Sequence, residues 1–201
     1  MNIIFITQKG LRSLFFVYAL LTICSGFAGT INPIDGLPLY YWDESAKINF
    51  GDHLSLKLVE RIVNGPVNVC PKTALNKTDK KLLAIGSILY FAREKDVLWG
   101  TGTNGKMPRR GDYRFTHLDV RAVRGPLTRK FLQKTFNITC PKIYGDPALL
   151  IPYFFPEFKK VENPARDYVF IPHHSEEKLF PKEHYPFVVY PTEPWDIVIR
   201  A

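Results

Sequence analysis

The hydrophobic pattern first predicts a strand, a turn and a helix. Residues 39–42 form a short apolar and aromatic run, as in a strand, and the polar turn 49–52 follows it. Within residues 53–63 the apolar side chains recur at the spacing of one helical face, and Asp52 is placed to cap that helix. The pattern predicts the opening of a β-α unit.

The same order of strand, glycine-containing turn and helix recurs further along the chain. Strands of the buried type are predicted at 81–85, 96–99 and 119–123, with glycines just past their ends. A helix follows at 127–136, and Pro126 suits its first turn. Strands that alternate with helices form a parallel sheet. We therefore expect the fold class α/β, with one Rossmann-like lobe at residues 37–152.

The pattern changes after this lobe. Residues 153–166 are rich in proline and charge, which is typical of a linker. Beyond them, strands are predicted at 167–174 and 187–190, and a helix begins at 194. Such a unit cannot bury its own sheet. We therefore expect residues 167–201 to be the incomplete start of a second lobe.

The first 29 residues have the order of a targeting segment. Lys9 and Arg12 precede the apolar run 14–23, and small residues follow between 25 and 29, as in a secretory signal peptide. The run is shorter than the about 20 residues that span a bilayer. Three interpretations stay open: a cleaved signal peptide, an uncleaved membrane anchor, or a strand and helix of the fold. We expect an exported or membrane-anchored protein through residues 1–29, with a cytoplasmic one as the alternative.

Charge narrows the classes of partner. The chain has 201 residues, with 27 Lys and Arg against 19 Asp and Glu. This excess favours anionic ligands such as phosphates and acidic glycans. The basic residues are scattered without a recognition helix, so nucleic acid is not expected as a partner, and membrane contact is expected only through residues 1–29. No CxxC or Cys/His cluster is present, so no metal is expected.

Two further features depend on the compartment. Cys70 and Cys140 would be free to pair in an oxidising compartment, and the sequence leaves their pairing open. The triplets at 76–78 and 137–139 match the acceptor pattern for N-glycosylation, which matters only in a eukaryotic secretory pathway.

Short fragments at the predicted strand ends occur in a characteristic order. They are Tyr41-Trp42, Asn49-Phe50-Gly51-Asp52, Ile85-Gly86-Ser87-Ile88-Leu89, Trp99-Gly100-Thr101-Gly102, Val120-Arg121-Ala122-Val123-Arg124-Gly125-Pro126-Leu127-Thr128, Tyr144-Gly145-Asp146-Pro147-Ala148-Leu149-Leu150 and Ile171-Pro172-His173. In this order they resemble the polysaccharide pyruvyl transferase family over about residues 39–199.

The resemblance implies both a fold and a reaction. The fold is two facing Rossmann-like lobes, similar to B-type glycosyltransferases, with the active site in the cleft. The reaction joins pyruvate from phosphoenolpyruvate, as a ketal, to two hydroxyls of a sugar in a cell-surface glycan or its lipid-linked precursor. No cofactor is implied, since phosphoenolpyruvate is the donor substrate.

One family motif is absent from this sequence. The C-terminal lobe of the family carries a Ser-Ser-x-His-Gly type motif with the catalytic histidine, and this chain has no Ser-Ser pair. We therefore expect a truncated transferase. Two alternatives stay open: an inactive glycan- or phosphate-binding homologue or fragment, and one half of an enzyme whose C-terminal lobe is encoded separately.

Arginine is the expected ligand for phosphoenolpyruvate, which carries about three negative charges, because a guanidinium binds phosphate and carboxylate through paired hydrogen bonds. Arg121 and Arg124 lie at the end of a predicted strand before a helix, where backbone N–H groups also favour anions. Strand alternation points them to opposite faces, so Arg124 is the stronger candidate. The alternative for either is a salt bridge to Asp119 or Asp146.

The other candidates also lie at strand ends. Substrate contacts are expected from Asn49, Gly51, Asp52, Gly86, Ser87, Gly100, Thr101, Gly102 and Asp146. Each has a structural alternative as a turn former or helix cap. Ketal formation also needs acids and bases, and His173 is the catalytic candidate within this chain, with a surface pair of His173 and His174 as the alternative.

Overall fold

The computed structural model describes residues 37–43, 48–106, 109–159, 161–164 and 167–201. The targeting segment predicted at residues 1–29 lies outside these ranges. Within them, no helix has both the length and the apolar character needed to cross a membrane.

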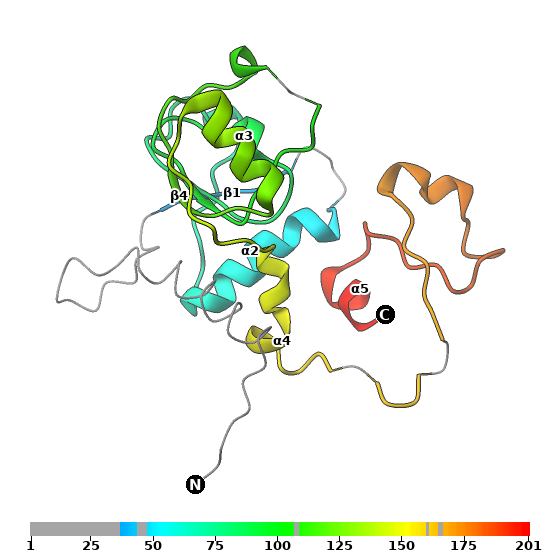
Figure 1. Ribbon diagram of the computed structural model, residues 1–201. Helices are drawn as coiled ribbons and strands as arrows, with labels where there is room; N and C mark the ends of the chain where they lie inside the picture. The colour runs from blue at the N-terminus through cyan, green and yellow to red at the C-terminus, as the bar shows by residue number, and fades with distance from the viewer. Residues whose placement is uncertain (1–36, 44–47, 107–108, 160, 165–166) are drawn as a thin grey trace, which may run out of the picture.

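Four short parallel strands form the centre of the fold (Figure 1). They are β1 (Leu39–Tyr40), β2 (Leu82–Leu83), β3 (Val97–Trp99) and β4 (Asp119–Ala122), hydrogen-bonded in the order β1-β2-β3-β4. All three pairings are parallel. The predicted α/β class with a parallel, Rossmann-like sheet is confirmed, although the strands are shorter than the apolar runs that predicted them.

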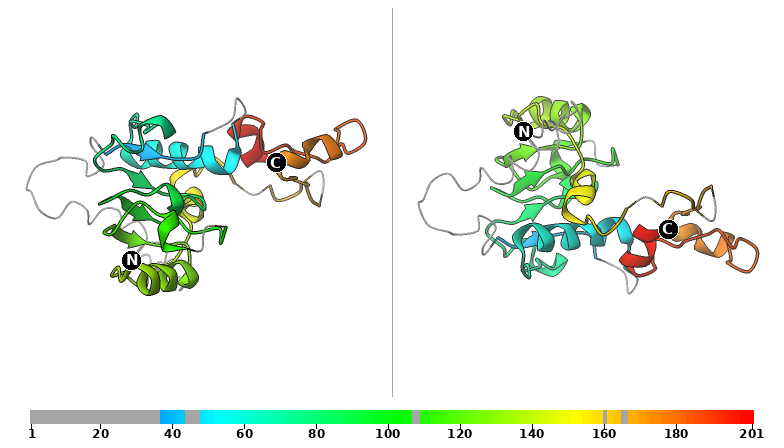
Figure 2. Two further views of the ribbon diagram at one scale, coloured as in Figure 1. Left: turned by 90° about the horizontal axis from the view of Figure 1, so that it is seen from above. Right: turned by 90° about the horizontal axis from the view of Figure 1, so that it is seen from below.

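Two long helices cover the sheet from different sides, and Figure 2 shows the strands between them. Helix α2 (Phe50–Val63) packs with one set of alternating strand residues: Leu39, Leu82, Val97 and Trp99. Helix α3 (Pro126–Phe136) packs with the other set: Tyr40, Leu83 and Leu98. Because successive side chains of a strand point to opposite faces, both faces are apolar and both are buried.

Helix α2 begins three residues earlier than predicted. Asn49, and not Asp52, is its N-cap: the Asn49 Oδ1 accepts hydrogen bonds from the backbone N–H groups of Gly51 (3.0 Å) and Asp52 (3.5 Å). Phe50 N–H donates to the carbonyl of Pro191 (2.6 Å), so a distant segment also supports the first turn. The prediction that Asp52 caps this helix is wrong. The predicted Pro126 start of α3 is confirmed.

Short helical turns occupy most of the connections. They are η2 (Lys72–Ala74), η3 (Leu89–Phe91), η4 (Arg110–Asp112), η5 (Pro147–Leu150) and α4 (Ile151–Phe154). The last two pack against α2 and close one side of the core.

Residues 167–201 lie to the side of the sheet, next to α2 (Figures 1 and 2). They contain η6 (His174–Leu179) and α5 (Trp195–Arg200). The strands predicted at 167–174 and 187–190 are not formed: they meet at a single parallel bridge between Phe170 and Val188. An isolated strand pair lacks the neighbours that stabilise a sheet, so the two runs stay irregular.

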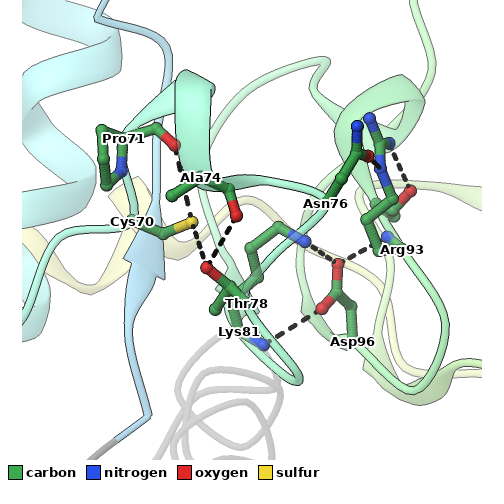
Figure 3. Close-up of polar contacts among 9 residues, drawn as sticks. Cys70, Pro71, Ala74, Asn76, Thr78, Lys81, Arg93 and Asp96 are labelled. Atoms are coloured by element: carbon green, nitrogen blue, oxygen red, sulfur yellow. Dashed lines mark hydrogen bonds and ion pairs between the residues drawn. The ribbon is translucent and has the colours of Figure 1, made fainter.

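A fully buried ion pair joins the amino ends of β2 and β3 (Figure 3). Lys81 Nζ donates to the Asp96 carboxylate, which also accepts from the backbone N–H groups of Lys81 (3.0 Å) and Arg93 (2.6 Å). Burial raises the pKa of Asp96 and lowers the pKa of Lys81, because desolvation penalises both charges.

Cys70 and Cys140 are both buried free thiols, so they do not form a disulfide in this structure. The Cys70 Sγ lies 3.2 Å from Thr78 Oγ1 (Figure 3). Burial raises the pKa of Cys140 to about 11.

We expect both thiols to react slowly in the folded protein, because both side chains are buried. For Cys140, a pKa of about 11 also leaves roughly one thiolate in a thousand at about pH 8. Iodoacetamide labelling, mapped by mass spectrometry, should modify Cys70 and Cys140 quickly only after denaturant is added. Complete labelling of either thiol within minutes in native buffer would contradict its burial.

Candidate functional site

The carboxyl ends of the four strands bring several candidates to one edge of the sheet. Gly86 and Ser87 follow β2, Thr101 and Gly102 follow β3, and Arg124 follows β4. In open α/β sheets this is the edge where ligands bind. Hydrogen bonds connect the loops that follow β2, β3 and β4 to one another.

Arg124 is held in place by neutral groups. Its Nη1 donates to Ser87 Oγ (2.6 Å), its Nη2 donates to the carbonyl of Thr103 (2.9 Å), and its backbone N–H donates to the carbonyl of Thr101 (3.2 Å). Arg124 is exposed, and it forms no ion pair with any residue that the structure describes. The guanidinium is therefore fixed in position while its positive charge remains available to a ligand.

Gly102 makes room for this arginine. A Cβ at position 102 would stand 2.8 Å from Arg124 Nε, which is closer than real contacts allow. The neighbouring Thr101 is buried, and its Oγ1 donates to the carbonyl of Gly86 (2.9 Å), which also accepts from Gly102 N–H (3.0 Å). Thr101 and Gly102 thus support the loop that carries Arg124.

Asp52 also lies close to the Gly86-Ser87 turn. Gly86 has a φ of +105°, and a Cβ at that position would lie 3.7 Å from Asp52 Oδ1. Burial raises the pKa of Asp52 to about 6, although the nearby His174 lowers it. The turn therefore has a half-buried carboxyl group near Gly86 and a cation bonded to Ser87.

Arg121 does not join this group. Its Nε and Nη2 donate to the two carboxylate oxygens of Asp119, at 2.6 and 3.0 Å. Lys80 Nζ lies 3.7 Å from the same carboxylate. The two arginines have different partners, and Arg121 forms one of the salt bridges considered for it.

Four other candidates have structural contacts. Asn49 caps α2, and the Asp146 side chain accepts a hydrogen bond (3.0 Å) in the first turn of η5. Gly51 is exposed at the start of α2. Gly100 has a φ of +91°, and a Cβ there would stand 2.4 Å from Cδ of Pro147. The close approach at Gly100 is therefore to the chain itself.

His173 caps the η6 helix. Its Nδ1 lies 2.7 Å from Ser175 Oγ, and its ring centroid lies 4.2 Å from that of His174. His174, and not His173, is the histidine whose charge acts on Asp52. The histidine pair is visible in the sequence. The carbonyl of Thr103 could not be found there, because a backbone acceptor leaves no signal in a sequence.

A hollow of about 830 Å³ lies elsewhere, beside the amino ends of the strands. Its charged lining is mixed: Lys77, Arg93 and Arg114 against Asp79 and Glu94. Two acids offset most of the positive charge of this lining, whereas Arg124 has no ion-pair partner among the described residues. In the part of the chain that the structure describes, no group of three His, Cys, Asp or Glu residues is arranged to hold a metal ion.

A parallel sheet with a helix packed on each face defines a Rossmann-like α/β protein, and a fixed arginine lies at the carboxyl edge of its sheet. The family model for polysaccharide pyruvyl transferase matches residues 14–191. The chain belongs to the polysaccharide pyruvyl transferase family, which confirms the family inferred from the strand-end fragments. Comparison with curated proteins and with solved structures gave no significant match.

Proposed function

We propose that this protein transfers pyruvate from phosphoenolpyruvate to a sugar of a cell-surface glycan, forming a ketal. Membership of the family supports a sugar or glycan acceptor. The observation that carries the choice of donor is Arg124, whose guanidinium is held by Ser87 and Thr103 without a neutralising acid among the described residues.

The edge of the sheet suits a small anion in two ways. The guanidinium of Arg124 offers paired N–H groups that match a carboxylate or a phosphate. Helix α3 begins two residues later, at Pro126, and its first N–H groups point toward the same edge, where the helix dipole also favours negative charge. In this proposal, Arg124 binds the carboxylate or the phosphate of the donor.

The test is the affinity of the purified chain for phosphoenolpyruvate, measured by calorimetry. Arg124→Ala is expected to weaken binding by about 10- to 100-fold, since hydrogen bonds to charged groups contribute about 1.5–3 kcal/mol. Arg124→Lys should fall in between, because it keeps the charge and loses the paired geometry. Gly102→Ala should also weaken binding, since the new Cβ displaces the guanidinium.

Arg121→Ala is the matched control, because Arg121 lies in β4, three residues before Arg124, and is paired with Asp119. Its affinity should equal that of the unmodified chain. Equal binding by Arg124→Ala would remove this residue from the donor site. Binding of phosphoenolpyruvate without release of phosphate in the presence of sugars would indicate a phosphate-binding homologue in place of a transferase.

A further inference from the structure

Asp52 is a carboxyl group with an unusual position. It lies in the first turn of α2, half-buried, with Oδ1 near the Gly86 turn, whose next residue, Ser87, accepts a hydrogen bond from Arg124. Within the described ranges, no donor forms a hydrogen bond to the Asp52 carboxylate. A desolvated carboxylate without such bonds is costly in its charged form.

Two titratable groups face Asp52 from other elements. His174 of η6 lowers the pKa of Asp52, and Tyr40 at the end of β1 has its own pKa raised in part by Asp52. The effect of burial is larger than that of His174, and the pKa of Asp52 is about 6. Both protonation states are therefore populated near neutral pH, which suits a group that gives and takes a proton.

We propose that Asp52 is a catalytic residue that exchanges protons with both substrates at this edge of the sheet. The inference rests on the proposed function, and it adds a catalytic role for a residue that the sequence suggested as a substrate contact or a helix cap. It places the proton donor beside Gly86 and the anion-binding Arg124 beside Ser87, the next residue of the same turn.

The proton balance of the first addition closes on this single group. The protonated carboxyl gives its proton to C3 of phosphoenolpyruvate, which becomes a methyl carbon, while the oxygen of a sugar hydroxyl bonds to C2. The resulting carboxylate takes the proton of that hydroxyl and is restored. A second hydroxyl then bonds to C2 as the C2–O bond to phosphate breaks, and its proton leaves with inorganic phosphate.

The first measurement is proton uptake on binding phosphoenolpyruvate, obtained by calorimetry in buffers of different ionisation enthalpy at about pH 7. A bound anion raises the pKa of a neighbouring carboxyl group, so the unmodified chain should take up more protons than Asp52→Asn does. The second measurement is phosphate release with a methyl hexopyranoside as acceptor. Asp52→Asn should lower its rate by about 10²- to 10⁴-fold. Glu60→Gln, on the same helix, is the control.

Each outcome decides between the two claims. If the unmodified chain binds no phosphoenolpyruvate, or binds it and releases no phosphate, the proposed function fails and this inference fails with it. If it binds and turns over, but Asp52→Asn takes up as many protons or releases phosphate as fast, the inference alone is overturned. The inference is supported if Asp52→Asn loses both the extra proton uptake and the phosphate release while Glu60→Gln keeps them.

Thermal unfolding is the control that tests whether Asp52→Asn folds. The folded-state pKa of Asp52 is raised, so ionisation costs stability as pH rises from about 4 to about 6. Asp52→Asn lacks this cost, and its midpoint should exceed that of the unmodified chain above about pH 6 and equal it below about pH 4. A lower midpoint at neutral pH would show that the carboxylate stabilises the fold, which contradicts the environment on which the inference depends.

Discussion

Asp96→Asn is expected to lower the free energy of unfolding by about 3–5 kcal/mol, because it leaves the Lys81 ammonium buried without a counter-charge. Both side chains of this pair are fully buried. In the native protein the carboxylate accepts hydrogen bonds from Lys81 Nζ and from the backbone N–H of Arg93. The amide of the variant can place its own N–H group against these donors, so a hydrogen bond is lost as well. Urea denaturation of the two proteins measures the difference.

A second variant and a control separate charge from shape. Lys81→Met combined with Asp96→Asn removes both charges, so it should recover at least half of the loss. Glu60→Gln breaks a partly exposed pair with Lys57 and should cost no more than about 1 kcal/mol. A loss below about 1 kcal/mol for Asp96→Asn would mean that water reaches the pair.

Gly100→Ala is expected to cost roughly 2–4 kcal/mol, the sum of backbone strain and overpacking. Its φ of +91° is unfavourable for a side chain, and the Cβ would stand 2.4 Å from Pro147 Cδ and 3.0 Å from the carbonyl oxygen of Gly145. Neither neighbour is the end of a flexible side chain, so the loop after β3 must move. Chemical denaturation again gives the loss.

Two other glycines serve as controls for Gly100. Gly105 has a φ of +77° with nothing within 4 Å of its added Cβ, so Gly105→Ala isolates the strain, at about 1 kcal/mol. Gly65 has open space and no such φ, so Gly65→Ala should be nearly neutral. If Gly100→Ala costs no more than Gly105→Ala, the contact with Pro147 is not a constraint.

Much of the fold could be predicted because its signals are local. Apolar runs gave the strands and their parallel arrangement, and Pro126 gave the start of α3. The start of α2 could not be chosen in this way, because Asn49 and Asp52 are both good caps. The structure shows Phe50 N–H bonded to Pro191, a contact that spans most of the chain and leaves no local trace.

In the candidate site, too, contacts between residues close in the sequence could be predicted, and contacts between distant residues could not. Arg121 and Arg124 have different partners, and the partner of Arg121 lies only two residues away. The partners of Arg124 lie 37 and 21 residues away, and those contacts exist only once the sheet has formed. The environment of Asp52 depends on the distant His174 in the same way.

The two bonds that hold Arg124 also bear on the entropy of recognition. A free arginine side chain loses about 1.5–2 kcal/mol of rotamer freedom when it is immobilised. Because Ser87 and Thr103 already restrict its guanidinium, this loss occurs during folding and does not recur when an anion arrives. An arriving anion would therefore meet a receptor that is ordered in advance.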